Sequence, residues 1–103
     1  MERFKPRSPL GKRLVERRQL VLAIAARRHA SNVRVFGSVV RGEDRPDSDV
    51  DLLVDLEDPT DLFNLLGLER ELEEVLGVRV DADTTESLRP RVRAEVIAEA
   101  IVL

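Results

Sequence analysis

Residues 35–54 read VFGSVVRGEDRPDSDVDLLV, and this stretch decides how the chain folds. It links two apolar runs, residues 33–36 and residues 50–56, through a polar connection. Short runs of this kind, rich in valine and bounded by glycine or polar residues, predict β-strands. The connection at residues 42–48 contains a proline followed by an aspartate and predicts a loop. The segment is therefore expected to form a strand, a Gly-Ser bend, a loop and a second strand.

The preceding residues predict one long helix. Ser8 is suited to cap its start, and Pro9 to occupy its first helical position. Apolar residues then recur at helical spacing as far as about His29. Ser31 and Asn32 are expected to break this helix before the first strand begins.

Another helix is expected after the second strand. Asp58 and Pro59 repeat the N-cap and proline signal, with the acidic Asp61 in the first turn. Gly77 predicts the end of this helix. The buried stripe is predicted to consist of five leucines, namely Leu62, Leu65, Leu66, Leu72 and Leu76.

The rest of the chain predicts a third strand, a last helix and a short edge strand. Residues 78–83 alternate apolar and charged side chains, as a half-polar strand does. Residues 90–100 predict the last helix, and residues 101–103 the edge strand. The expected fold class is α+β, an α/β sandwich in which helices pack on a small mixed β-sheet. The last helix carries three larger apolar residues, Val92, Val96 and Ile97.

The composition excludes several classes of protein. Without cysteine, the chain has no disulfide, no cysteine-ligated zinc and no thiol catalysis, and its single histidine excludes a histidine-rich metal site. Three phenylalanines, with no Trp or Tyr, leave few rings to stack on single-stranded nucleic acid. Because no apolar run approaches the length that spans a bilayer, we expect a cytoplasmic protein with no membrane partner.

Charge divides the chain into a basic and an acidic part. Residues 1–34 hold ten Lys or Arg and two Glu, whereas residues 35–103 hold seven Arg and eighteen Asp or Glu. A chain of 103 residues has the length of one compact domain. We expect a single domain over residues 1–103, with a basic N-terminal helical segment at 1–31 and the core that carries the site at 32–103.

The Gly-Ser bend after the first strand is suited to binding an anion. Gly37 lacks a Cβ, so the backbone there can approach a bulky group closely. Ser38 offers a hydroxyl and a backbone N–H, and a helical turn over residues 39–42 would direct further N–H groups at the same point. The bend therefore predicts a cradle for a triphosphate, with Arg41 as a further phosphate contact or simply an exposed arginine. Ser48 is expected to hydrogen-bond the loop and help to aim the aspartate that follows.

Two carboxylates lie at the start of the second strand. Because side chains alternate along a strand, Asp49 and Asp51 face one side, with backbones about 7 Å apart. Carboxylates about 5 Å apart repel by about 3 kcal/mol at an effective dielectric constant of about 20. A cation between them removes this repulsion, and magnesium is suited to a few carboxylates, waters and substrate phosphates.

A third carboxylate is expected from the neighbouring strand. Asp81 lies on the polar face of that strand, and Asp83, on the same face, is the alternative. Three carboxylates can hold two metal ions about 3.5–4 Å apart, an arrangement suited to in-line attack at phosphorus. Asp81 is also placed to accept the proton of the attacking hydroxyl.

The stretch from residue 35 to residue 54 resembles the signature of the DNA polymerase β-type nucleotidyltransferases. It is most similar to the minimal nucleotidyltransferases that pair with small helical HEPN-domain proteins in toxin–antitoxin modules. The signature is Gly-Ser, ten residues, then Asp-x-Asp, and ten residues separate Ser38 from Asp49. Arg41-Gly42 and Ser48 also match. The resemblance extends over roughly residues 33–103, including the later Val80-Asp81 and the closing Glu99-Ala100-Ile101-Val102-Leu103.

The resemblance implies a nucleotidyltransferase fold and the role of an antitoxin that adenylylates its partner, a HEPN-domain toxin. Such a protein would transfer AMP from ATP to a hydroxyl of the partner, with two Mg²⁺ ions, and release pyrophosphate. Asp83 stands where an apolar residue would be expected, so Asp81 and Asp83 remain alternatives. By this resemblance the metal ligands are Asp49, Asp51 and Asp81, and the nucleotide-binding residues are Gly37, Ser38, Arg41 and Ser48.

Two alternatives to catalysis remain. The chain could keep the fold and neutralise its partner by binding alone, in which case Asp49→Asn and ATP would not affect the complex. It could instead bind nucleic acid through the basic first helix, with an affinity that falls steeply as salt rises. The acidic body and the scarcity of aromatic rings argue against nucleic acid, which we expect only through the toxin.

Overall fold

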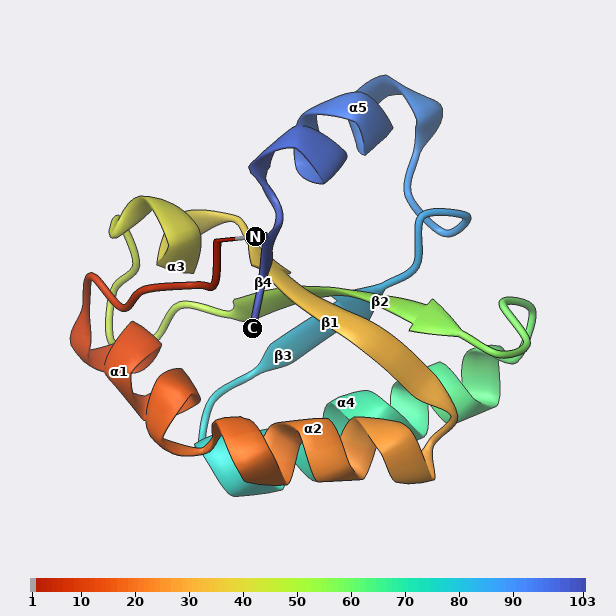
Figure 1. Ribbon diagram of the computed structural model, residues 1–103, viewed down its shortest axis with the longest axis horizontal. Coiled ribbons are helices and arrows are strands. Elements are labelled where there is room, and N and C mark those ends of the chain that lie inside the picture. The colour runs from red at the N-terminus through yellow and green to blue at the C-terminus, as the bar shows by residue number, and fades with distance from the viewer. Residues whose placement is uncertain (1) are drawn as a thin grey trace.

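The computed structural model describes residues 2–103, and within them the chain forms five helices and four strands (Figure 1). This is the α+β fold with a small mixed sheet that the sequence predicts. In chain order the elements are α1 (Pro9–Glu16), α2 (Arg18–Arg27), β1 (Ala30–Phe36), α3 (Ser38–Arg41), β2 (Val50–Leu56), α4 (Leu62–Leu76), β3 (Val80–Asp83), α5 (Pro90–Glu99) and β4 (Ile101–Val102).

The four strands form one sheet in the order β3-β2-β1-β4. β1 pairs with both β2 and β4 in antiparallel fashion, whereas β2 and β3 are parallel. Parallel neighbours need a crossover connection, and α4 provides it. The parallel pairing sets Asp51 beside Asp81, so two acidic residues far apart in the sequence become neighbours.

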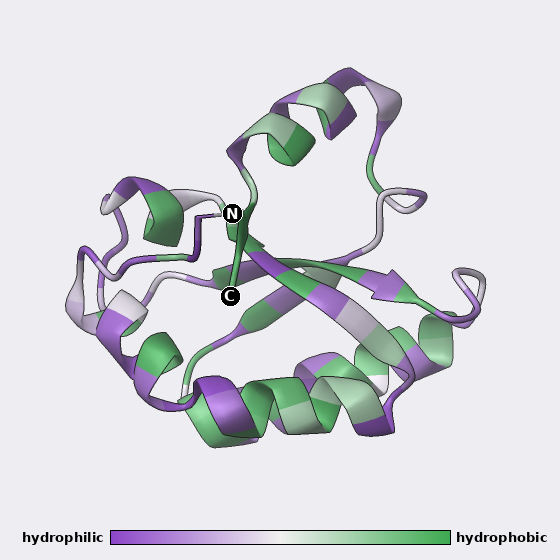
Figure 2. Ribbon diagram, viewed as in Figure 1, coloured by the Kyte–Doolittle hydropathy of each residue, from purple (hydrophilic) through white to green (hydrophobic). Residues whose placement is uncertain are grey.

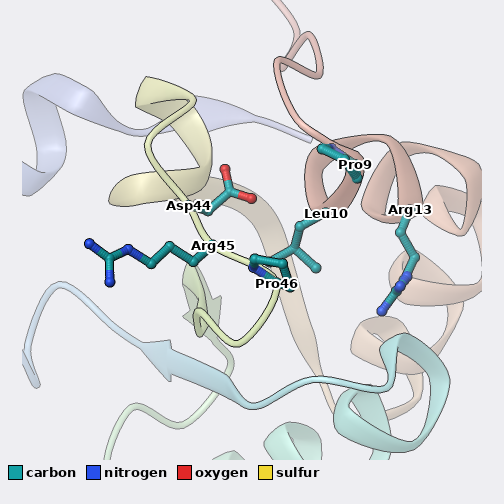
Figure 3. Close-up of a pocket in the computed structure, with 6 residues that line it drawn as sticks. All are labelled: Pro9, Leu10, Arg13, Asp44, Arg45 and Pro46. Carbon is teal, nitrogen blue, oxygen red and sulfur yellow. The ribbon is translucent and has the colours of Figure 1, made fainter.

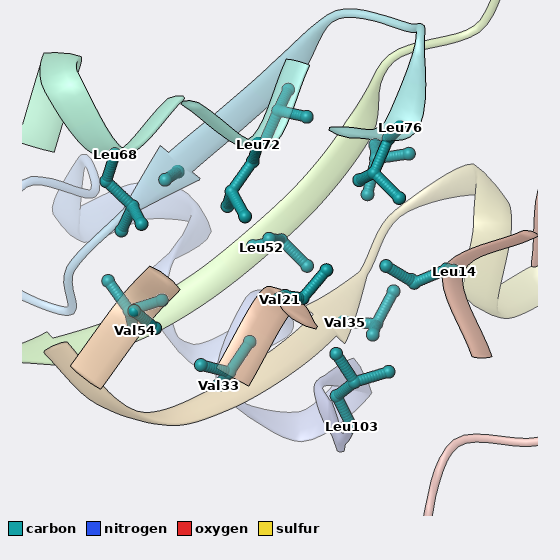
Figure 4. Close-up of a cluster of buried hydrophobic side chains, with 14 of the residues drawn as sticks. Leu14, Val21, Val33, Val35, Leu52, Val54, Leu68, Leu72, Leu76 and Leu103 are labelled. Carbon is teal, nitrogen blue, oxygen red and sulfur yellow. The ribbon is translucent and has the colours of Figure 1, made fainter. Parts of the chain in front are cut away.

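The core lies between one face of the sheet and the helices α2 and α4 (Figures 1 and 4). Hydrophobic and hydrophilic residues alternate along β3 and along residues 33–35 of β1 (Figure 2), so these segments turn their buried apolar side chains to the helices. The largest fully buried side chains of this cluster are Leu14, Leu52, Leu68, Leu72, Leu76, Val21, Val35, Val39, Val50 and Val54.

The opposite face of the sheet is more open and carries the acidic residues. Asp51, Asp81 and Asp83 point to this side, because their neighbours along each strand point into the core. α5 lies on this side of the sheet (Figure 1), and none of its residues is buried. Val92 and Ile97 remain 40% and 46% exposed, so the apolar residues of the last helix do not form a packed stripe.

The long first helix predicted from the sequence is wrong, because the structure has two helices there. Arg17 leaves helical geometry, with φ −102° and ψ 14°, and separates α1 from α2. The bend lets α1 contact α3 while α2 runs along β1. The predicted start is confirmed: the hydroxyl of Ser8 accepts a hydrogen bond from Gly11 N at 3.0 Å, and Pro9 is the first helical residue.

The predicted start of α4 is also wrong. Its N-cap is Asp61, whose carboxylate accepts a hydrogen bond from Asn64 N at 3.0 Å. Asp58 accepts instead from Thr60 within a turn. The end at Gly77 is confirmed, with φ 73°. The buried stripe is Leu65, Leu68, Leu72 and Leu76, whereas Leu62 and Leu66 are 59% and 51% exposed.

Strand bounds differ less from the prediction. β2 spans the predicted residues 50–56, and the predicted edge strand is β4. β1 begins earlier, at Ala30, and its pairing with β2 is irregular between residues 31 and 34. No helix within residues 2–103 has both the length and the apolar character that a membrane span requires.

Candidate active site

The Gly-Ser bend lies directly against Asp51. Gly37 has φ 79° and ψ −154°, a backbone conformation that residues other than glycine rarely adopt. A Cβ at this position would collide with the Asp51 carboxylate, whose Cγ would be 3.1 Å away. Glycine is therefore required twice, for the backbone turn and for the space that the carboxylate fills.

The residues after the bend form the short helix that was predicted as a helical turn. α3 begins at Ser38 and ends at Gly42, which has φ 71°. Ser48 lies in the following loop, where its hydroxyl accepts a hydrogen bond from Arg45 N at 2.7 Å. Ser48 thus forms the predicted hydrogen bond to the backbone of the loop that leads to Asp49.

Three carboxylates lie near one another on the side of the sheet where Asp51 contacts this bend. Asp51 and Asp81 are cross-strand neighbours, and Asp49 lies two residues before Asp51. Burial, followed by the charges of Asp81 and Asp49, raises the pKa of Asp51 from 3.8 to about 6. Burial and the charge of Asp49 also raise the pKa of Asp81. Arg79 lies near the group, with its Nε 3.9 Å from Asp49 Oδ1.

The geometry distinguishes the two candidates for the third carboxylate. Asp81 pairs with Asp51, whereas Asp83 pairs with Leu53, one step further along the parallel strands. The Asp83 carboxylate also accepts a hydrogen bond from Ser87 Oγ at 3.1 Å. Among the carboxylates that raise the pKa of Asp51, Asp81 has the largest effect and Asp83 the smallest. The register therefore favours Asp81.

These carboxylates suit a divalent cation by their chemistry, although they do not form a finished coordination shell. Among residues 2–103, no three Asp, Glu, His or Cys side chains stand together as a group that could hold a metal ion. The raised pKa values of Asp51 and Asp81 nevertheless show that burial and like charge are not compensated there. A cation bound beside these carboxylates would remove this penalty.

Arg41 is not free to bind a phosphate in this structure. Its guanidinium donates to Glu99 Oε2 from Nη1 at 2.6 Å and lies 3.3 Å from Glu43 Oε2 through Nε. Glu99 Oε1 also accepts a hydrogen bond from Gly37 N at 2.6 Å. Sequence reasoning did not connect Glu99 with the bend, because 62 residues separate it from Gly37 and no local spacing links them.

Two pockets in the described part of the chain, residues 2–103, are lined by none of Asp49, Asp51 and Asp81. One pocket of about 120 Å³ lies between α1 and the loop after α3 (Figure 3). It contains none of the residues that the sequence predicts for the site. A second cavity, of about 260 Å³, lies between α5 and the end of β1 and reaches Gly37 and Arg41. The first pocket is lined by Pro9, Leu10, Arg13, Asp44, Arg45 and Pro46.

A mixed sheet with carboxylates beside a Gly-Ser bend is the architecture of the nucleotidyltransferases. The model of the family described as the nucleotidyltransferase domain matches residues 17–103. The chain belongs to this family.

Two relatives are similar over most of the chain. The protein adenylyltransferase MntA of Thermococcus cleftensis is 45% identical over 69 residues, which cover 67% of this chain and 70% of the relative. A protein of Methanocaldococcus jannaschii, provisionally named a protein adenylyltransferase, is 34% identical over 86 residues. The matched part covers 84% of this chain and 92% of that relative.

Solved structures agree with the fold. One of them, provisionally described as a minimal nucleotidyltransferase, has a TM-score of 0.79 and 50% sequence identity. The match covers 89% of this chain and 94% of that chain. A toxin–antitoxin structure with AMP-PNP has a TM-score of 0.71 at 20% identity, and covers 82% of this chain and 69% of that one. The second match shows likeness of fold alone.

Proposed function

We propose that this protein transfers a nucleoside monophosphate, AMP from ATP, to a hydroxyl group on a partner protein. The observation that supports the proposal is that Asp51 contacts the Gly37–Ser38 bend while Asp49 and Asp81 lie close enough to raise its pKa. The names of the two relatives, both protein adenylyltransferases, support AMP as the group and protein as the acceptor.

In the proposed reaction, the acceptor oxygen forms a bond to the α-phosphorus of ATP, and the bond from this phosphorus to the bridging oxygen breaks. Pyrophosphate leaves with that oxygen. Asp81 accepts the proton of the attacking hydroxyl. The Ser38 hydroxyl and its backbone N–H bind the departing phosphates, and Gly37 allows the backbone of the bend to lie directly against Asp51.

We assign two Mg²⁺ ions to the three carboxylates. When bound, the ions supply positive charge that activates the attacking oxygen and stabilises the leaving pyrophosphate. The residues fit this assignment because Asp49, Asp51 and Asp81 bring three negative charges to one face of the sheet. Arg79 supplies one nearby positive charge against these three.

The proposed partner is a toxin of the HEPN class, for which this protein acts as antitoxin. Structures of MntA–HpeT toxin–antitoxin complexes share the fold, with a TM-score of 0.65 at 19% identity for one of them. That likeness, together with the relative named MntA, supports a toxin as the acceptor.

The experiment uses the product of the neighbouring gene as acceptor, with Mg²⁺ and labelled ATP. The parent protein is expected to add the mass of one AMP to this partner. Asp49→Asn and Asp81→Asn should lower the rate at least about 100-fold, because each removes a charge that holds the metal ions. Asp83→Asn should keep the rate within about threefold.

Asp47→Asn is the control, since it removes a carboxylate from the exposed loop before β2. Circular dichroism must show that each variant is folded. Equal transfer by Asp49→Asn and the parent would disprove the proposed reaction. Tight complex formation and neutralisation without any AMP transfer would instead establish an antitoxin that acts by binding alone.

A further inference from the structure

One carboxylate, that of Glu99, satisfies two donors at the edge of the site. Glu99 Oε1 accepts from Gly37 N, and Glu99 Oε2 accepts from Arg41 Nη1, both at 2.6 Å. Glu99 is the last residue of α5, so the two bonds join this helix to the bend. Hydrogen bonds to a carboxylate at this distance are charge-assisted and stronger than neutral ones.

Both donors belong to residues, Gly37 and Arg41, that the resemblance assigns to nucleotide binding. Carboxylate and phosphate oxygens are both anionic acceptors, and both can take two donors at once from neighbouring groups. Arg41 also lies within 3.3 Å of Glu43, so two carboxylates share its one positive charge. A triphosphate at the bend therefore competes with Glu99 for Arg41.

We propose that Glu99 sets the affinity for the nucleotide, because it occupies in the free protein the Gly37 N–H and the Arg41 guanidinium that the triphosphate must take over. The inference rests on the proposed function, since it requires a triphosphate at the Gly37–Ser38 bend. It assigns to Glu99 the role of an internal anion that leaves the bend when the substrate arrives.

The packing of α5 allows Glu99 to leave the bend without loss of core contacts. None of the ten residues of α5 is buried, and no core side chain is lost if its last turn moves. The residues after Glu99 are anchored separately, because Val35 pairs with Ile101 and Leu103 N donates to Val33 O at 3.0 Å. The last turn of α5 can therefore release Glu99 while β4 stays in the sheet.

The first test compares the binding of Mg²⁺ and AMP-PNP to the parent and to Glu99→Gln by isothermal titration calorimetry. The amide keeps the shape of the side chain and can still accept from Gly37 N, but it lacks the charge that holds Arg41. Glu99→Gln is expected to bind AMP-PNP about tenfold more tightly than the parent. An unchanged or weaker affinity would overturn the inference.

Glu95→Gln is the matched control. Glu95 lies one helical turn earlier on α5 and lines the same cavity, so its removal changes the local charge equally. The affinity of Glu95→Gln for AMP-PNP should stay within about twofold of that of the parent. An equal gain in both variants would mean a general charge effect and would also overturn the inference.

The outcomes separate this inference from the proposed function. If Glu99→Gln binds AMP-PNP more tightly but neither the parent nor the variant transfers AMP, the competition by Glu99 is supported and the proposed reaction is wrong. If the parent transfers AMP but Glu99→Gln shows no gain in affinity for AMP-PNP, the proposed reaction is supported and the competition by Glu99 is wrong. A parent that binds no AMP-PNP contradicts both.

Hydrogen exchange on the unmodified protein provides a second test. When AMP-PNP displaces Glu99, the backbone amides of residues 96–99 should exchange several-fold faster, because the last turn of α5 loses its connection to the bend. The amides of β2 should not change in this direction. Slower or unchanged exchange in α5 after nucleotide binding would contradict the displacement of Glu99.

Discussion

Asp51 illustrates at the level of one residue how a site costs stability. It lies half-buried in β2, beside Asp81 and against the Gly37 backbone. Burial and neighbouring charges raise its pKa to about 6, from 3.8 when the chain is unfolded. The folded protein therefore holds a proton on Asp51 between these pH values, where the unfolded chain has lost it.

The sign of the pH dependence follows from this shift. Below about pH 3.8 the Asp51 carboxyl is protonated in both states and has no effect. As the pH rises from 3.8 to about 6, folding becomes less favourable, and above that value the full penalty remains. After allowance for partial exposure to solvent, the penalty is about 1–2 kcal/mol.

Asp51→Asn should therefore be more stable than the parent in metal-free buffer at pH 8. The expected gain in the free energy of unfolding is about 1–2 kcal/mol, and it should vanish near pH 3.5. Urea unfolding with EDTA at both pH values measures it. Asp47→Asn, in the exposed loop, should show no such pH-dependent gain. A less stable Asp51→Asn protein at pH 8 would show that the carboxylate is compensated within the fold.

At the level of elements, the sequence predicted correctly those bounds of strands and helices that depend on neighbouring residues. The bounds of β2 and the end of α4 at Gly77 depend on neighbouring residues, and both predictions are confirmed. The prediction of Asp58 as the N-cap of α4 is wrong, because Asp61 can cap a helix equally well and does so here. A turn at Asp58, in which Thr60 is the hydrogen-bond donor, precedes the helix along the chain.

The two aspartates give a direct comparison. Asp61→Ala removes the acceptor for Asn64 N and should lower the free energy of unfolding by about 1 kcal/mol. Asp58→Ala loses only an exposed turn contact and should lower the free energy of unfolding less than Asp61→Ala does. Urea unfolding at pH 7 measures both values. A larger loss for Asp58→Ala would place the cap where the sequence alone suggested.

At the level of the whole molecule, the site depends on contacts that no local pattern reveals. The Asp-x-Asp spacing predicted that Asp49 and Asp51 share a face, because strand geometry is local. The choice of Asp81 over Asp83 needed the register of β2 with β3, which the crossover through α4 sets. The link from Glu99 to Gly37 spans 62 residues and became visible only in the folded chain.

The position of β4 also depends on the whole fold. Phe4 N donates to Val102 O at 2.7 Å, so β4 joins the N-terminal segment to the sheet, and Leu103 is 3% exposed in the main core. Leu103→Ala should therefore cost about 2–4 kcal/mol and lower the Tm by roughly 10 °C or more. Ile97→Ala removes a similar side chain from the half-exposed surface of α5, so its Tm should fall by less than about 5 °C. Thermal unfolding followed by circular dichroism compares the two variants, and equal losses would mean that Leu103, directly after β4, does not anchor the fold.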